Sequence, residues 1–207
     1  MSLISKLRKH GIKGISSIVL RKIFLIEIMK FHYLKIKLDY DLLKMQLKDF
    51  DLKVKELKYN DFLLGDKSLF QGKKMEVIKK RFDDPTYKAY GIVENGVLIY
   101  SAWISLNILG LPIKSDIKLE ESEGYLEDDF CHPAYRSQGI HSKMNIYRKF
   151  KLCELGKKEC IIVVLDGNLP AIQTQIKSGA KDLGCFYAGK IFGIPFVNLN
   201  KSKYDSY

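Results

Sequence analysis

The chain has 207 residues, of which 46% are hydrophobic and 29% charged, with 12 Tyr and 11 Phe. This composition excludes a disordered chain and predicts one sizeable domain with a short appendage. Thirty-five Lys and Arg against 24 Asp and Glu give a net charge of +11, which favours anionic partners such as nucleic acid, anionic lipid or phosphorylated small molecules.

Residues 12–33 place apolar side chains such as Ile15, Ile18 and Ile23 at helical spacing between Lys and Arg. This pattern predicts an amphipathic helix within an N-terminal extension over residues 1–45. Two interpretations stay open: the helix packs on the main domain or on another subunit, or it lies on a membrane as a peripheral contact. Because such a helix and a strand-rich C-terminus offer two pairing surfaces, we expect a homo-oligomer.

The start of the chain shows neither a cleavage site after an apolar stretch nor the roughly 20 apolar residues that a spanning helix needs. We therefore expect a cytoplasmic protein. The cysteines include no Cys-x-x-Cys pair and no His at metal-ligand spacing, so we expect reduced thiols and no metal. The four are Cys131, Cys153, Cys160 and Cys185.

The main domain is expected over residues 46–200, followed by a loose tail over residues 201–207. Alternation of apolar and charged residues predicts a half-buried strand at residues 50–54. One apolar face over residues 69–83 predicts a helix that ends before Pro85.

Two aromatic-rich runs joined by Glu94-Asn95-Gly96 predict a β-hairpin over residues 87–108. A strand over residues 123–132 follows, then a turn, and then a helix from Ile140 to about Leu155. The segment ECIIVVL is typical of a strand buried on both faces. A short helix and two final strands complete an α+β or mixed α/β order of elements.

A glycine turn lies between the strand over residues 123–132 and the helix that follows it. Residues 136–141 (RSQGIH) bring several backbone N–H groups to the positive end of a helix, an arrangement that suits a pyrophosphate. Gly139 lets such a ligand approach the main chain closely. A purely structural turn explains the same glycine, and both interpretations stay open.

The segments around this turn resemble the GNAT superfamily of acyl-CoA N-acyltransferases. FCHPAYRSQGIHSKM is similar to the family's strand followed by x-Pro-x-Tyr-Arg and Gln/Arg-x-x-Gly-x-Gly/Ala. IIVVLDGNLPAIQTQIKSGA is similar to its later strand, Asn-x-x-Ala and terminal Gly. The resemblance covers residues 50–200 in element order, with the motifs in 125–180. It implies a splayed, mainly antiparallel central sheet flanked by helices, with acyl-CoA as co-substrate in the split.

The resemblance also implies which residues bind acyl-CoA. Phe130 and Cys131 would contact the pantetheine arm, and Asn168 and Ala171 would lie beside it on the second splayed strand. The residues implied for the pyrophosphate are Arg136, Ser137, Gln138, Gly139, Ile140, His141 and Ser142.

Two positions depart from the family pattern. His141 stands where the family usually has Gly or Ala. Gln175 stands where the family often has a Tyr general acid, and an amide cannot donate that proton. The proton for the leaving thiolate is then expected from Ser178, Tyr187 or solvent.

The candidate catalytic bases are Glu127 and Asp129, which strand alternation places on one face, with Asp128 on the other. A solvated acidic face explains the same residues, and some members of the family manage without a dedicated base. His132 is a further candidate for the base, or a structural residue beside the turn.

The resemblance implies direct transfer of an acetyl or longer acyl group from acyl-CoA to a primary amine. The N-terminal extension and the positive charge are similar to members that acylate nucleotide-linked amino sugars for surface polysaccharide, so this acceptor is favoured over protein amines, polyamines and antibiotics. The alternative from another class is a non-catalytic basic module that binds nucleic acid or membrane. Because Lys and Arg are spread along the chain without a nucleic-acid-binding motif, we expect no nucleic acid partner.

Overall fold

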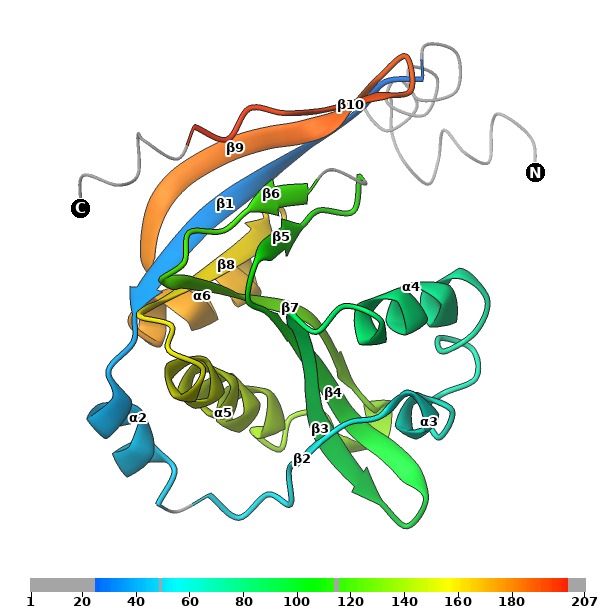
Figure 1. Cartoon of the computed structure of the whole chain (residues 1–207), viewed down its shortest axis with the longest axis vertical. Coiled ribbons are helices and arrows are strands. Elements are labelled where there is room, and N and C mark those ends of the chain that lie inside the picture. Colours follow the sequence, from blue (N-terminus) through cyan, green and yellow to red (C-terminus); the bar gives the residue numbers. More distant parts are fainter. Residues whose placement is uncertain (1–24, 49, 114–115, 201–207) are drawn as a thin grey trace.

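The computed structural model describes residues 25–48, 50–113 and 116–200. Within them, one large curved sheet carries helices on both of its faces (Figure 1). Its strands lie in the order β10-β9-β1-β8-β7-β4-β3-β2, and a separate two-stranded sheet pairs β5 with β6. Neighbouring strands of the large sheet are antiparallel except for β7 and β8, which are parallel. The expected mixed α/β fold with a mainly antiparallel sheet is confirmed.

The bounds of the elements follow the chain. The strands are β1 (Glu27–Lys37), β2 (Lys55–Glu56), β3 (Tyr87–Glu94), β4 (Val97–Ser105), β5 (Ile108–Gly110), β6 (Asp116–Lys118), β7 (Glu123–Cys131), β8 (Glu159–Leu165), β9 (Lys181–Ile191) and β10 (Ile194–Val197). The helices are α2 (Tyr40–Gln46), α3 (Tyr59–Phe62), α4 (Lys73–Phe82), the 3-10 turn η1 (Pro133–Tyr135), α5 (Ile140–Glu154) and α6 (Leu169–Lys177).

The sheet splits between β7 and β8. These strands pair only at their beginnings, where Glu123, Gly124 and Tyr125 lie opposite Glu159, Cys160 and Ile161. Farther on, β7 stays paired with β4 as far as Cys131, and β8 stays paired with β1 as far as Leu165. Both strands therefore keep their outer partners while their inner edges part, and the expected splay is confirmed.

The strand β1 corrects the predicted N-terminal helix. Residues 27–33 of the predicted helix belong to β1, which pairs antiparallel with β8 on one edge and β9 on the other. Phe31, Tyr33 and Leu34 are buried in this position, so burial between two neighbours outweighs the local helical spacing. The sheet therefore begins at Glu27 and not after residue 45. Residues 25 and 26 have no regular structure, and residues 12–24 of the predicted helix, like the tail, lie outside the described residues.

The predicted strand at residues 50–54 is also wrong. These residues are irregular, and the first strand of this region is the two-residue β2. Phe50, Leu52 and Val54 nevertheless pack against the main core, which explains their alternation without a β-ladder. The hairpin of β3 and β4 is confirmed, with Asn95 and Gly96 at its turn.

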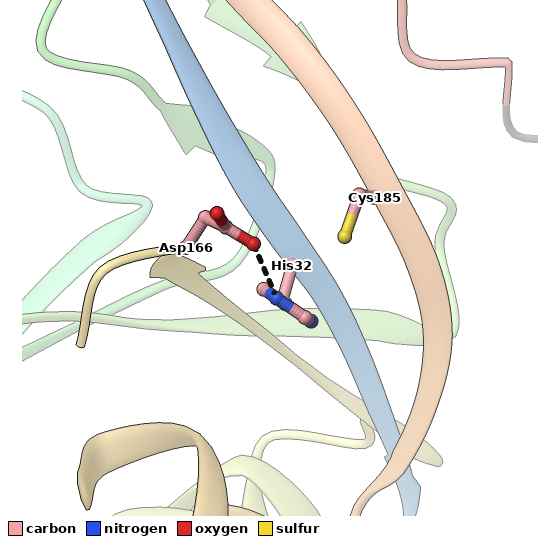
Figure 2. A group of neighbouring side chains, drawn as sticks. All are labelled: His32, Asp166 and Cys185. Carbon is pink, nitrogen blue, oxygen red and sulfur yellow. Dashed lines mark hydrogen bonds and ion pairs between the residues drawn. The ribbon is translucent and has the colours of Figure 1, made fainter. Parts of the chain in front are cut away.

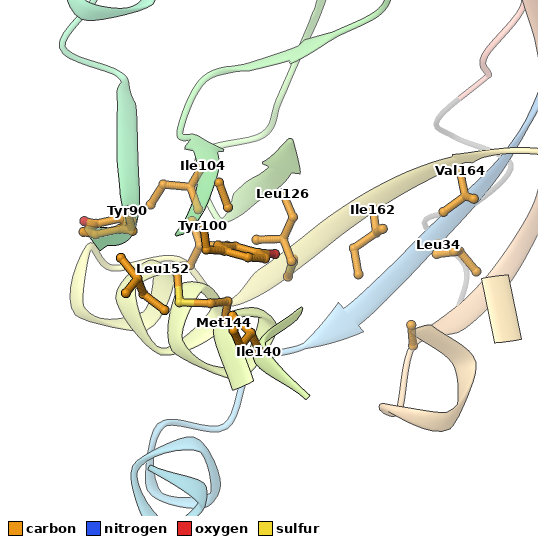
Figure 3. Close-up of a cluster of buried hydrophobic side chains, with 14 of the residues drawn as sticks. Leu34, Tyr90, Tyr100, Ile104, Leu126, Ile140, Met144, Leu152, Ile162 and Val164 are labelled. Carbon is orange, nitrogen blue, oxygen red and sulfur yellow. The ribbon is translucent and has the colours of Figure 1, made fainter. Parts of the chain in front are cut away.

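Helix α5 joins the two halves of the split sheet. Its Ile140, Met144 and Leu152 belong to one buried cluster with side chains from both halves (Figure 3). Those partners are Tyr90, Tyr100 and Ile104 from β3 and β4, Leu126 from β7, Ile162 and Val164 from β8, and Leu34 from β1. Because α5 is held from both sides, its N-terminus has a defined position beside the split.

The opposite face of the sheet is covered by two further clusters. Side chains of α3 and α4 pack with Trp103 and Leu98 of β4. Leu109 and Ile117 of the small β5-β6 sheet belong to a cluster with residues of β1, β8 and β9. In the described part of the chain, no helix is both long and apolar enough to cross a bilayer.

Candidate active site

A β-bulge interrupts β7 where it has left β8. Ser101 pairs with Phe130 and Trp103 pairs with Glu127, so β7 carries one residue more than β4 between these pairs. Asp128 has a φ of 51°, a conformation that is uncommon for a non-glycine residue. Such a bulge redirects the side chains that follow it.

The bulge overturns the predicted arrangement of the three acidic residues. Arg81 of α4 binds both Glu127 and Asp128, with N–O distances of 2.5 Å and 2.7 Å. Asp129 instead pairs with Arg148 of α5 at 2.6 Å. Glu127 therefore shares its side of the sheet with Asp128 and not with Asp129, because the extra residue shifts the alternation by one.

Glu127 has the environment of a base that titrates near neutrality. One carboxylate oxygen contacts Arg81, while the other, Oε2, is buried without a hydrogen-bond partner among the described residues. Burial raises the pKa of Glu127 from its ordinary 4.5 to about 7, although the charge of Arg81 acts in the opposite direction. A group with this pKa can accept and release a proton at physiological pH.

Asp129 is held as a structural carboxylate. Both of its oxygens contact the guanidinium of Arg148, which is 1% exposed and also donates to the carbonyl oxygens of Trp103 and Glu127. Asn145 Oδ1 accepts from the same guanidinium. This engagement favours a role for Asp129 in fixing the bulge over a role as base.

The glycine turn has the geometry of an anion site. Ser137 and Gly139 have φ values of 63° and 75°, and Gly139 is the N-cap of α5. The first helical hydrogen bond of α5 is donated by the amide of Lys143 to the carbonyl oxygen of Gly139. Among the described residues, the amides of residues 137–142 have no such main-chain acceptor. The amides of residues 137–142 are therefore available to a ligand. A Cβ built on Gly139 would meet nothing within 4 Å, so the space in front of the turn is open.

The first residues of the predicted CoA site connect this turn to β7. Arg136 Nε donates to the carbonyl oxygen of Cys131 at 3.2 Å, which places its guanidinium at the end of β7. The ring of Phe130 packs edge-on against that of Phe70, with 4.9 Å between the ring centroids. Cys131 packs against the buried cluster that contains Ile140, Met144 and Leu152 of α5. Burial raises the pKa of the Cys131 thiol. Because these side chains already contact other parts of the chain, an extended ligand would pair with the main chain of β7, along the edge that has parted from β8.

Asn168 and Ala171 begin α6. Asn168 Oδ1 accepts a hydrogen bond from the amide of Ala171 at 3.3 Å, so the side chain is the N-cap of this helix. Ala171 packs against the main core. Both residues directly follow β8, the second strand of the split, but their contacts within the chain are structural.

The imidazole of His141 turns toward the sheet. Its Nδ1 lies 2.9 Å from the hydroxyl of Tyr100, and its Nε2 lies 3.2 Å from Nδ2 of Asn145. The departure from Gly or Ala at this position is therefore accommodated, since only the main chain of His141 and of its neighbours Ile140 and Ser142 is needed for the anion site.

Two of the predicted proton donors are poorly placed. Tyr187 lies on β9, which β1 separates from β8 and the split. The hydroxyl of Ser178 donates to the carbonyl oxygen of Gln175 and accepts from Lys149 Nζ at 3.2 Å. His132, the alternative base, uses Nδ1 to accept from the amide of Ala134 and so stabilises the turn η1. Of the three predicted sources of the proton for the leaving thiolate, only solvent is compatible with these positions and contacts.

Arg81 and Arg148 were missed by the sequence analysis, although both left a signal. Arg148 lies four residues from Met144 and from Leu152, on the apolar side of α5. Arg81 lies three residues after the buried Ile78 of α4. A charged residue on an apolar helical face has to find a buried partner, but the sequence does not reveal which carboxylate it is.

A cluster of His32, Asp166 and Cys185 lies at the far end of β8 (Figure 2). Their candidate ligand atoms lie within 4.8 Å of one another. The two nitrogens of His32 already contact Asp166 at 2.9 Å and Asp182 at 2.7 Å, and Lys30 pairs with Asp166. These contacts account for the cluster as a connection between β1, β8 and β9. Sequence spacing could not reveal it, because its members come from three distant segments.

Comparisons with known proteins address the fold. Neither a protein-family model nor a curated protein matches the sequence. A protein of Novosphingobium aromaticivorans, assigned to the GNAT acetyltransferase family, is similar with a TM-score of 0.53 and 11% identity, over 79% of this chain and 65% of its own. A conserved protein of unknown function from Staphylococcus epidermidis is similar with a TM-score of 0.53 and 14% identity, over 89% of this chain and 64% of its own.

A third similar structure is a glucosamine N-acetyltransferase region of a fungal multi-domain β-N-acetylglucosaminidase, with a TM-score of 0.55 and 14% identity, over 86% of this chain and 22% of that one. This chain thus spans less than two thirds of the length of each of these proteins. At such identities the likeness concerns the fold, and the fold of this chain is GNAT-like.

Proposed function

We propose that this chain is an N-acyltransferase that moves an acyl group from acyl-CoA directly to a primary amine. The observation that carries the proposal is the parting of β7 and β8 beside the glycine turn of α5. An extended pantetheine arm fits an unpaired strand edge, and a pyrophosphate fits the free amides and Arg136 at the N-terminus of α5.

The residues on β7 supply the chemistry. The thioester provides the acyl group, so that a C–N bond forms, the C–S bond breaks and the thiolate takes its proton from solvent. Glu127 accepts the proton of the attacking amine, a role that its position in the bulge and its pKa of about 7 support. Arg81 holds the carboxylate in place, and Arg148 holds the bulge from the α5 side.

For the acceptor we propose the amino group of a nucleotide-linked amino sugar. The net charge of +11 favours a phosphorylated acceptor over a polycation. The glucosamine N-acetyltransferase region named above has a similar fold and acts on an amino sugar. Protein amines, polyamines and antibiotics are the competing acceptors, and either acetyl or a longer acyl group is compatible with the proposal.

The test of CoA binding compares two glycines at the two ends of α5. Gly139 and Gly156 have φ values of 75° and 80°, and a Cβ at either one meets nothing within 4 Å. Gly139→Glu and Gly156→Glu therefore introduce the same charge at a similar backbone cost, but only the first enters the proposed anion site. Calorimetric titration with acetyl-CoA and CoA is expected to show saturable binding that Gly139→Glu abolishes and Gly156→Glu retains. Absence of binding to the wild-type protein, or equal loss in both variants, would contradict the proposal.

The test of the acceptor is a product assay by mass spectrometry. Acetyl-CoA is supplied with nucleotide-linked amino sugars, and in parallel with a polyamine, an aminoglycoside and a lysine peptide. We expect an N-acetylated nucleotide sugar as the preferred product. Preference for one of the other amines would overturn the acceptor and leave the acyl transfer intact.

A further inference from the structure

An exposed apolar patch lies at one end of the large sheet, away from the proposed acyl-transfer site. We call it the hairpin patch. Phe192 and Ile194 are 68% and 71% exposed, the two highest values among the exposed large hydrophobic residues of the described chain. In Figure 1 the tip of β9 and β10 and the start of β1 lie together, at the end of the molecule remote from α2 and α5. The members of the hairpin patch are Leu25, Ile28, Ile191, Phe192 and Ile194.

The strand register places much of this patch on one face. Ile194 lies opposite Ile191, and Ile28 lies opposite Gly189. Because Gly189 and Ile191 are two residues apart on β9, their positions share a face of the sheet. Ile28, Ile191 and Ile194 therefore form a continuous apolar surface that ends at Phe192.

An exposed aromatic residue, Phe192, occupies an unfavourable backbone conformation in the turn at the tip. Two hairpins of this chain have two-residue turns with positive φ at both positions. Asn95 and Gly96 have φ values of 50° and 75°, and Phe192 and Gly193 have 51° and 81°. Asn-Gly is the preferred pair for such a turn, and a bulky side chain there costs stability. A Phe that is 68% exposed recovers little of that cost by burial within the chain.

The chain that leads into the patch is basic. Among the described residues, Lys190 on β9 lies opposite Glu27, and Lys30 on β1 pairs with Asp166 at 3.0 Å. The chain that precedes Leu25 contains no Asp or Glu. Its basic residues are Lys6, Arg8, Lys9, Lys13, Arg21 and Lys22.

We propose that the hairpin patch docks on an anionic lipid bilayer, with Phe192 and Ile194 at the boundary between headgroups and acyl chains. An exposed apolar tip, in a chain of net charge +11 whose sequence before Leu25 has basic residues and no acidic ones, matches the two attractions that hold a peripheral protein on such a surface, burial of apolar area and electrostatics. This docking involves strands β1, β9 and β10. It goes beyond the proposed acyl transfer and does not depend on it.

The test is co-sedimentation with vesicles of phosphatidylglycerol mixed with phosphatidylcholine, compared with phosphatidylcholine alone. The wild-type protein is expected to bind the anionic vesicles, and less strongly as salt is raised. Phe192→Asn installs the Asn-Gly pair of the other hairpin, so the melting temperature should stay equal or rise. Its partition onto vesicles should nevertheless fall by about tenfold, the effect of losing one buried aromatic side chain. Leu69→Asn, which removes an exposed leucine elsewhere, should bind like the wild type.

Three results would overturn the docking. The first is failure of the wild-type protein to bind anionic vesicles, and the second is unchanged binding by Phe192→Asn. The third is an oligomer in light scattering that Phe192→Asn dissociates, which would make the patch a contact between two copies of the chain. Transfer to a soluble acceptor should be unchanged in Phe192→Asn, so loss of lipid binding and loss of the proposed activity are distinguishable.

Discussion

Arg148 reaches from α5 to Asp129 on β7 with an ion pair of 2.6 Å, although the arginine side chain is only 1% exposed. The contact crosses from the helix to the bulged strand at the point where the proposed base leaves the regular ladder. A buried cation without its carboxylate is costly, and so is a carboxylate in this place without its cation.

Arg148→Met should therefore lower the free energy of unfolding by about 3 kcal/mol, because a buried pair loses one partner. Urea denaturation measures the change. Lys143→Met on the same helix is the control, since Lys143 pairs with the exposed Asp51, and it should cost less than about 1 kcal/mol. Equal effects of the two substitutions would contradict a special role for the buried pair.

The pH dependence of catalysis should follow Glu127. Its carboxyl has a pKa of about 7, and only the ionised form can accept a proton. The value of kcat/KM should thus rise with pH and level off above about pH 7. Glu127→Gln should remove this rise and lower kcat by about a hundredfold or more. A wild-type profile without an inflection near pH 7 would exclude Glu127 as the base.

Glu127 should also make stability depend on pH. Its pKa is higher in the folded protein than the ordinary 4.5, so the folded state binds the proton more tightly. The free energy of unfolding should fall as pH rises from about 4.5 to about 7, by an amount on the order of 3 kcal/mol. Glu127→Gln keeps an acceptor for Arg81 and should lack this fall in a series of urea denaturations. A fall of the same size in the variant would assign the effect to other groups.

Lys149 should be a source of instability. It is 3% exposed, its Nζ contacts Ser178 Oγ at 3.2 Å, and burial, with the nearby charge of Arg148, lowers its pKa. Because the unfolded chain binds that proton more tightly, wild-type stability should rise with pH in the alkaline range below pH 10.5. Lys149→Met should raise the free energy of unfolding at pH 7 by about 1 to 2 kcal/mol. The exposed Lys177→Met is the control, and destabilisation by Lys149→Met would contradict this prediction.

The first effect of replacing Asn168 should be a loss of stability of α6, because its side chain is the N-cap of this helix. Asn168→Ala removes the side-chain acceptor of the Ala171 amide and should cost about 1 kcal/mol of stability. Asn168→Ser restores a capping oxygen and should recover most of the loss in thermal unfolding. If KM for acyl-CoA rises in both variants alike, Asn168 also contacts the pantetheine arm, as the family resemblance implies.

Local patterns were reliable where an element decides its own conformation. The Asn95-Gly96 turn requires positive φ at both residues, and the hairpin formed there. The apolar spacing from Ile140 onward produced α5 with Gly139 at its start. Residues 27–33 show the limit, because their spacing is compatible with a helix until two neighbouring strands take up both edges.

The sequence by itself determined the order of the main elements from the hairpin of β3 and β4 onward, apart from the small β5-β6 sheet, together with the glycine turn and the acidic stretch on the strand before it. These features depend on short-range preferences and side-chain chemistry. Only the tertiary structure decided which carboxylate is free to act. The bulge at Asp128 turns Glu127 toward Arg81 and Asp129 toward Arg148, and this bulge depends on pairing with β4, a strand some 25 residues earlier in the chain. Partners brought together by folding, and not by spacing along the chain, set the charge and the burial of each group.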